Sequence, residues 1–282
     1  MRIVVTGATG TVGSRVLRGL VDRGLGAVGA VRRPGPRDLP APTVAFDATR
    51  PETFAPALDG ADGLFLMLPP GSGARLADVV EAAEAAGVTK VAFLSVQGAA
   101  RNPLLPHRAV EKRLESGAAD ALLVRASYFM QNLSEVHADD VRRGVVAVPA
   151  GTGRTAFVDA RDVADVAAAW LADETPPLGP REGSATPVEV TGPEALDYFE
   201  VARALSEALG RRVVYTRPGA VEFFRRQRAE GAPAAFAGVM TALYTSARLG
   251  LAGRVTDGVE GALGRPPRTL REFAQDSVDA WT

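Results

Sequence analysis

The chain of 282 residues has no cysteine, only two histidines (His107 and His137), and lysine only at positions 90 and 112. Without cysteine, disulfides, thiolate catalysis and cysteine-ligated zinc or iron–sulfur centres are excluded. Two histidines are also too few for a histidine-rich metal site. The sequence therefore predicts a protein with no metal site.

An excess of one charge and long apolar runs are missing as well. Lys plus Arg total 32 against 33 for Asp plus Glu, and no long block of like charge is present, which disfavours nucleic-acid and acidic-membrane partners. The first apolar run, Ile3 to Val5, is too short for a signal-peptide core, and no stretch approaches a membrane span. We expect a cytoplasmic protein with no nucleic-acid or membrane partner.

Short β-branched runs alternate with helical patterns through the first two-thirds of the chain, as is typical of βαβ units. We expect strands at about 2–6, 27–31, 44–46, 63–68, 90–95 and 121–125. The first helix carries an apolar stripe of Val12, Val16, Leu17 and Leu20. The fold class predicted is α/β, a Rossmann-type doubly wound and mainly parallel sheet.

Helix starts are indicated at two further places. Thr49 to Glu52 has the T-x-x-E pattern of a capping box before Phe54, and Asp162 precedes an amphipathic run that begins at Val163. Both patterns predict a capped helix.

The texture changes after about residue 172, where proline and glycine between 175 and 184 break any helix. Longer helical patterns follow near 196–209, 219–230, 234–249 and 268–281. We expect a Rossmann domain that binds NAD(P) over 1–172 and a smaller C-terminal lobe, mainly 173–282, that caps the substrate. Segments of the first are expected to interleave with the second.

The most informative motif is the glycine loop Gly7-Ala8-Thr9-Gly10-Thr11-Val12-Gly13, which follows the first strand and opens the first helix. Because glycine lacks Cβ, amides of such a loop and of the helix N-terminus can approach a pyrophosphate closely. The predicted cofactor contacts here are Gly7, Thr9, Gly10, Thr11, Val12 and Gly13. The alternative is a tight turn with no ligand.

The second strand ends in Arg32-Arg33, where an NAD-binding protein places an acidic residue on the ribose 2′-hydroxyl. Guanidinium groups suit a 2′-phosphate, which Asp or Glu would repel. We therefore expect NADP(H) as the cofactor, held by Arg32 and Arg33. The two arginines could also simply solvate the strand end.

Three stretches beyond the loop, at 127–132, 144–149 and 157–164, resemble the NmrA-like family of atypical short-chain dehydrogenase/reductases. The most specific are Tyr-Phe-x-x-Asn from Tyr128 and Phe-Val-Asp-x-x-Asp-Val-Ala from Phe157. Within the family the chain is most similar to the NAD(P)H:quinone oxidoreductase type, and the likeness covers essentially the whole chain. The resemblance also implies an NADP contact from Arg32.

Further cofactor contacts are expected where later strands end, because open α/β sheets bind ligands at their carboxyl ends. The predicted residues are Asp47 and Ala48 after the third strand, Leu66, Met67 and Leu68 on the fourth, Ser95, Val96 and Gln97 on the fifth, and Tyr128 and Phe129 after the sixth. In similar proteins the first group lies near the adenine and the last two flank the nicotinamide. The alternatives are a local turn for Asp47 and core packing for Met67, Tyr128 and Phe129.

The catalytic pair of short-chain dehydrogenases is missing. Four residues after each tyrosine stands Asn132, Ala202, Gly219 or Arg248, so no Tyr-x-x-x-Lys exists. The family pattern puts His107 where the lysine would be, and His107 with Glu111 resembles the His-x-x-x-Glu of the quinone-reductase branch. We expect His107 to bond the nicotinamide ribose or a substrate oxygen, with Tyr128 as a wall or hydrogen-bond donor. The alternative for His107 is an exposed histidine linked to Glu111.

Two functions remain open. The first is an NADPH-dependent reductase that passes hydride directly to an electron-poor small molecule, such as a quinone, an enone or a polyketide-like aromatic. The second, which the founding NmrA-like members imply, is a non-catalytic NAD(P)-binding sensor or regulator. The His-x-x-x-Glu resemblance favours the enzyme; whether the chain forms a homodimer stays open.

Overall fold

The computed structural model describes residues 1–35, 38–67, 75–174 and 185–282, which form two compact units. Unit 1 comprises Met1–Ala126, Ala160–Val190 and Gly258–Arg265, and unit 2 comprises Ser127–Asp159, Thr191–Asp257 and Pro266–Thr282. These units differ from the predicted division at residue 172, because Ser127–Asp159 belongs to unit 2 and Gly258–Arg265 belongs to unit 1. Each unit is described by itself.

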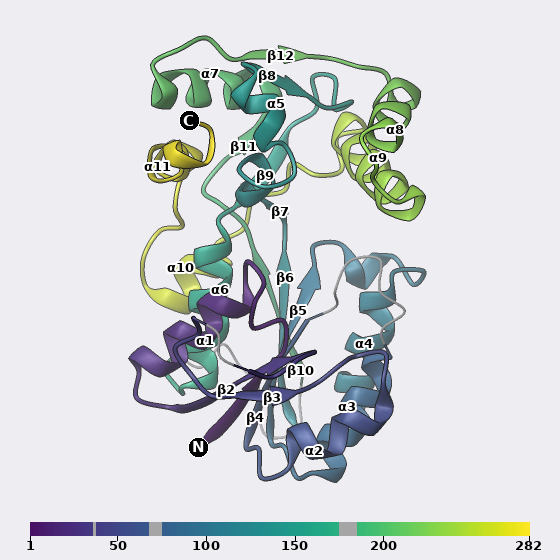
Figure 1. Ribbon diagram of the computed structural model, residues 1–282, viewed down its shortest axis with the longest axis vertical. Helices are drawn as coiled ribbons and strands as arrows, with labels where there is room; N and C mark the ends of the chain where they lie inside the picture. The colour runs from purple at the N-terminus through teal and green to yellow at the C-terminus, as the bar shows by residue number, and fades with distance from the viewer. Residues whose placement is uncertain (36–37, 68–74, 175–184) are drawn as a thin grey trace. The chain divides into compact units, whose positions relative to one another are not determined.

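Unit 1 is built on a seven-stranded sheet in the order β10-β6-β5-β4-β1-β2-β3, in which all paired strands are parallel (Figure 1). Its strands are β1 (Arg2–Val5), β2 (Gly26–Val31), β3 (Thr43–Ala45), β4 (Gly63–Met67), β5 (Lys90–Val96), β6 (Asp120–Ala126) and β10 (Ala185–Val190). The predicted Rossmann-type fold is confirmed, and each of the six expected strands lies within one residue of its expected bounds, apart from Leu68, which is outside the described residues.

The seventh strand, β10, was not expected, since Pro187 lies inside it and a proline-rich stretch precedes it. It pairs only with β6, at the edge of the sheet. Proline is tolerated on an edge strand because its missing N–H is not needed by a second neighbour.

Helices cover both faces of this sheet (Figure 1). Contacts join α1 (Gly13–Asp22), α6 (Ala160–Leu171) and α10 (Gly258–Leu263) on one face. The other face carries η1 (Pro51–Thr53), α2 (Phe54–Leu58), α3 (Leu76–Ala85) and α4 (Pro106–Glu115), and η2 (Ala99–Arg101) precedes α4. The predicted stripe of α1 is buried as expected: Val12, Val16, Leu17 and Leu20 all lie in the core.

The two predicted helix caps are wrong, although both helices exist. The α6 helix begins at Ala160, so Asp162 lies inside its first turn, fully buried and paired with Arg265 at 2.9 Å. Before α2, the Thr49 hydroxyl donates to Asp47 Oδ1 at 2.7 Å instead of capping the helix. The apolar periodicity located the helices, but tertiary partners decided where the polar side chains bond.

Unit 2 contains a three-stranded sheet in the order β11-β9-β7 and a two-stranded sheet β12-β8. Its elements are β7 (Tyr128–Phe129), η3 (Met130–Leu133), α5 (Ala138–Arg142), β8 (Val145–Ala147), β9 (Thr155–Val158), β11 (Ala195–Leu196), α7 (Tyr198–Leu209), β12 (Val214–Thr216), α8 (Ala220–Ala229), α9 (Ala234–Arg248), α11 (Leu270–Asp276) and η4 (Val278–Ala280). The four later helical patterns expected from the sequence correspond to α7, α8, α9 and α11 with η4. All four tyrosines of the chain lie in the core of this unit. Among the described residues, no helix has the length and apolarity needed to cross a membrane.

Candidate cofactor site

The strand order brings the predicted cofactor residues of unit 1 to one edge of its sheet. Because β3, β2, β1, β4 and β5 are neighbours and parallel, their carboxyl ends meet there. Along this edge lie, in order, Asp47 with Ala48, Arg32 with Arg33, the glycine loop, Leu66 with Met67, and Ser95 to Gln97. The strand order reverses between β1 and β4, the place where open α/β sheets bind ligands. Leu68 lies outside the described residues.

The three loop glycines play different structural roles. Gly7 has φ +63°, and a Cβ there would lie 2.2 Å from Met67 Sδ. A Cβ on Gly13 would lie 2.2 Å from the carbonyl oxygen of Gly7. A Cβ on Gly10 would meet only that same oxygen, at 3.3 Å, and the φ of Gly10 is ordinary. The fold itself requires Gly7 and Gly13, whereas the space beside Gly10 is open to a ligand.

The N-terminus of α1 has no capping side chain. Val12, the N-cap residue, is buried and contributes no side-chain hydrogen bond, and the first turn contains no acidic residue. No carboxylate from the helix itself therefore pairs with the N–H groups of this turn or with the positive end of the helix dipole. Thr9 is exposed and Thr11 is partly exposed beside them. This end of the loop is chemically suited to an anion.

A positive group stands at the end of β2, as the sequence predicted. Arg32 and Arg33 are both exposed. One oxygen of Asp47 accepts hydrogen bonds from Thr49, at 3.0 Å from its N–H and 2.7 Å from its hydroxyl. These bonds, and then the charge of Arg32, hold the pKa of Asp47 below its usual value. The local turn considered for Asp47 is thus present, and it places a carboxylate in the field of Arg32.

The ends of β4 and β5 present only some of their predicted residues. Leu66 and Ser95 are fully buried, as Ala48 nearly is, so these three side chains belong to the core. Met67, Val96 and Gln97 are partly exposed. The N–H of Met67 donates to Thr6 Oγ1 at 3.0 Å and that of Gln97 to the carbonyl of Ala126 at 2.8 Å, which fixes both strand ends.

His107 lies on the first turn of α4, half buried, with its ring centroid 6.2 Å from that of Phe93. Its Nδ1 is buried and finds no hydrogen-bond partner among the described residues. Burial lowers the pKa of His107 below its usual value, against the opposite effect of the Glu111 charge. The imidazole of His107 therefore favours its uncharged form.

Glu111 is not the partner of His107 that the i, i+4 spacing suggested. Its carboxylate is fully buried and accepts from Ser95 Oγ at 2.6 Å, from Arg125 Nε at 2.9 Å and Nη2 at 2.8 Å, and from Arg108 Nη1 at 3.1 Å. Sequence reasoning missed Arg125. A signal was present, because an arginine that directly follows the buried run Ala121 to Val124 needs a partner.

The two aromatic residues after β6 belong to unit 2. Tyr128 is 8% exposed, its hydroxyl is hydrogen-bonded to that of Tyr244, and its ring meets Phe157 edge to face at 5.5 Å. Burial raises the pKa of Tyr128 well above its usual value, so the phenol cannot act as a base near neutrality. These surroundings match the core-packing alternative. Phe129 is partly exposed.

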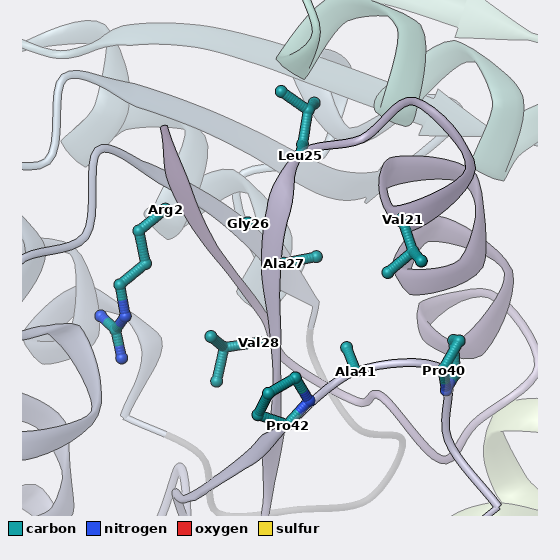
Figure 2. A pocket seen from close by; sticks show the side chains of 9 residues that line it. All are labelled: Arg2, Val21, Leu25, Gly26, Ala27, Val28, Pro40, Ala41 and Pro42. Atoms are coloured by element: carbon teal, nitrogen blue, oxygen red, sulfur yellow. The ribbon is translucent and has the colours of Figure 1, made fainter.

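A shallow pocket of about 490 Å³ lies elsewhere on unit 1 (Figure 2). It is lined by Arg2, Val21, Leu25, Gly26, Ala27, Val28, Pro40, Ala41 and Pro42. It lies at the amino ends of β1 and β2, opposite the glycine loop, and the Arg2 guanidinium is bonded to backbone carbonyls of Ala57 and Asp59. This pocket is therefore separate from the cofactor edge.

Comparison with known proteins agrees with this geometry. The model of a family described as NAD(P)H-binding matches residues 7–174. An NAD(P)H azoreductase of Xenophilus azovorans is 35% identical over 290 residues, covering 99% of both chains.

Solved structures with the same fold span the whole chain. The NADPH-dependent quinone oxidoreductase QOR2 of Escherichia coli, complexed with NADPH, has a TM-score of 0.84 and 25% identity, and covers 98% of this chain and 99% of its own. The negative transcriptional regulator NmrA, in complex with NADP, has a TM-score of 0.76 and 18% identity over 98% of this chain and 94% of its own. The second likeness shows the shared fold.

Proposed function

The chain belongs to the NAD(P)H-binding family, among its NmrA-like oxidoreductases, and on this basis we propose that it is an NADPH-dependent reductase of an electron-poor, conjugated small molecule. The observation that carries the proposal is the carboxyl edge of the unit 1 sheet. Three features lie along this edge: a glycine loop with open space beside Gly10, a helix N-terminus without a capping side chain, and an exposed arginine pair. The first two suit the pyrophosphate of a dinucleotide, and the arginine pair suits a 2′-phosphate.

The residues at this edge fit NADP(H). The amides of the loop and of the first turn of α1 would hold the pyrophosphate, since no side chain caps that turn and a ligand can approach Gly10. Arg32 would hold the 2′-phosphate, because its guanidinium can make paired hydrogen bonds to a phosphate. Asp47, whose pKa is held low, would remain charged and reinforce the position of Arg32.

The sequence lacks the Tyr-x-x-x-Lys pair that short-chain dehydrogenases use for proton transfer. No tyrosine precedes a lysine by four residues, and the Tyr128 phenol is buried with a raised pKa. When bound, NADPH supplies a hydride from its nicotinamide ring. A quinone that accepts this hydride becomes a hydroquinone anion, and this anion can take up a proton from water afterwards. Such an acceptor suits a site that lacks a proton donor.

His107 is the group we assign to positioning the acceptor or the nicotinamide ribose. It follows β5 on α4 and is neutral at pH 7, so one ring nitrogen can donate a hydrogen bond while the other accepts one. Val96 and Gln97, partly exposed at the end of β5, would line the same region. We do not assign a chemical role to the Tyr128 hydroxyl, because it is already hydrogen-bonded to the Tyr244 hydroxyl.

Steady-state oxidation of NADPH with a panel of quinones, enones and azo compounds tests the proposal directly. We expect turnover with at least one acceptor class and a lower KM for NADPH than for NADH. Azo compounds belong in the panel because of the azoreductase relative. A protein that binds NADPH tightly but reduces no acceptor would refute the enzyme and favour the dinucleotide-sensing function.

A further inference from the structure

A buried ion cluster joins three elements of unit 1 next to His107. The Glu111 carboxylate on α4 receives the hydroxyl of Ser95 from β5, two guanidinium N–H groups of Arg125 from β6, and one of Arg108 from α4 itself. Each of its oxygens accepts two hydrogen bonds, so the carboxylate has no remaining capacity for the imidazole one turn away.

The charges of this cluster are balanced within it. Arg108 also donates to Glu115 Oε1 at 2.6 Å, so two arginines face two carboxylates. Burial alone would raise the pKa of Glu111, but the hydrogen bonds from Arg125 and Ser95 and the charge of Arg125 hold it below its usual value. A buried carboxylate persists in this state only when its partners keep good geometry. The cluster therefore fixes α4 onto β5 and β6 one turn beyond His107.

The groups known to act on His107 are the Glu111 charge from its own helix and the Phe93 ring of β5. A carboxylate four residues along a helix would ordinarily pair with an imidazolium and stabilise its charge. In this protein Arg125 and Arg108 already form hydrogen bonds with that carboxylate, so it does not pair with His107.

We propose that Arg125 and Arg108, acting through Glu111, are positioning residues that keep His107 an uncharged hydrogen-bonding group for the bound acceptor. The part that concerns the acceptor rests on the proposed function. An uncharged imidazole orients an acceptor oxygen without protonating it, which agrees with hydride transfer that precedes proton uptake. The buried Nδ1 of His107, which has no hydrogen-bond partner among the described residues, agrees with this assignment.

Proton NMR titration of the whole protein tests the charge assignment without any turnover, because the chain has only two histidines. The wild-type His107 signal should titrate below the ordinary histidine pKa. Arg108→Gln removes a cation from Glu111 and should move the midpoint upward, whereas Glu111→Gln removes the anion and should move it downward. His137, in unit 2, is the internal reference and should not move.

Arg113→Gln is the matched control. Arg113 lies on the same helix but pairs with Glu84 of α3, outside the cluster. The Arg113→Gln variant should leave the titration midpoint of His107 unchanged. If Glu111→Gln does not fold, the comparison of Arg108→Gln with Arg113→Gln still decides. A wild-type His107 that titrates at or above the ordinary value, or an equal midpoint in the two arginine variants, would overturn the proposal.

A kinetic pH profile tests the link to the acceptor. Wild-type kcat should be flat across the pH at which His107 titrates in Arg108→Gln, while that variant should gain an inflection at its own NMR midpoint. If the NMR midpoint of His107 shifts in an active Arg108→Gln enzyme but kcat shows no inflection at that pH, His107 does not contact the acceptor. An inert protein with the expected NMR shifts would refute the proposed function but leave the charge assignment standing.

Discussion

Replacing Gly10 by valine should weaken NADPH binding strongly and leave the protein folded. A Cβ at Gly10 would meet only the Gly7 carbonyl oxygen, at 3.3 Å, and the backbone there is not left-handed. Substituting glycine where the backbone is compatible changes the free energy of unfolding by only about 0.4–1 kcal/mol, often favourably. The main effect is therefore expected on the ligand that approaches the loop, with a small shift of the Gly7 carbonyl to admit the Cβ.

The expected loss of affinity follows from the hydrogen bonds that a pyrophosphate would make. A hydrogen bond to a charged group contributes about 1.5–3 kcal/mol. If the valine side chain prevents two amides from reaching the phosphates, about 3–6 kcal/mol is lost, or roughly 10²- to 10⁴-fold in Kd. Gly10→Ala should show a smaller loss in the same direction. Calorimetric titration with NADPH and urea unfolding measure the two effects separately.

Two other glycines make this experiment interpretable. A Cβ on Gly13 would lie 2.2 Å from the Gly7 oxygen and 2.8 Å from that of Thr6, so Gly13→Ala should destabilise the fold itself, by about 1–3 kcal/mol or more. Gly261, on α10, has no atom within 4 Å of a built Cβ, and Gly261→Ala should bind NADPH normally. Wild-type affinity in a folded Gly10→Val protein would show that the loop is only a turn.

Three further results are expected. Arg32→Ala should raise the Kd for NADPH about 10- to 100-fold, the loss of one charged hydrogen bond, and leave that for NADH unchanged; an equal effect on both would contradict the 2′-phosphate assignment. Burial lowers the pKa of His137 to about 4, below the value of about 6.5 in the unfolded chain, so the unfolded state binds a proton first as the pH falls. The free energy of unfolding should therefore fall by about 3 kcal/mol between about pH 6.5 and 4. Urea unfolding at several pH values measures this dependence on pH, and His137→Gln should reduce it. Tyr128→Phe should keep most turnover and normal NADPH affinity, with about 1 kcal/mol lost from stability for its bond to Tyr244; a folded variant that binds NADPH but is inactive would refute the assignment.

The fold of unit 1 was predictable because its signals are local. The six strands expected from the sequence are short, mainly apolar runs, and α1 shows its buried stripe in the spacing of Val12, Val16, Leu17 and Leu20. The edge strand β10 gave no such signal, since Pro187 and a proline-rich approach argue against a strand. Its place depends on β6, about sixty residues earlier in the chain.

That the candidate cofactor residues share one edge of the sheet was predictable for a related reason. In a parallel sheet the carboxyl ends of all strands share one edge, so a correct list of strands places the residues that follow them together. Which of those side chains reach the surface was not predictable. Met67 is the last residue of β4 and Ser95 the last but one of β5, but Ser95 is buried against Glu111 while Met67 is partly exposed beside Gly7.

Local patterns along the chain were enough to predict the parallel α/β fold, the glycine loop and the arginines after β2, because strand and helix periods and the conformational needs of a turn are properties of neighbouring residues. Three outcomes depended on the tertiary structure: Glu111 binds Arg125 instead of His107, the Tyr128 hydroxyl bonds to that of Tyr244, and a Cβ would approach the Gly7 oxygen to 2.2 Å at Gly13 but only to 3.3 Å at Gly10. The physical reason is that these outcomes depend on which residues meet in space and on how water is excluded around them. Spacing along the chain specifies neither.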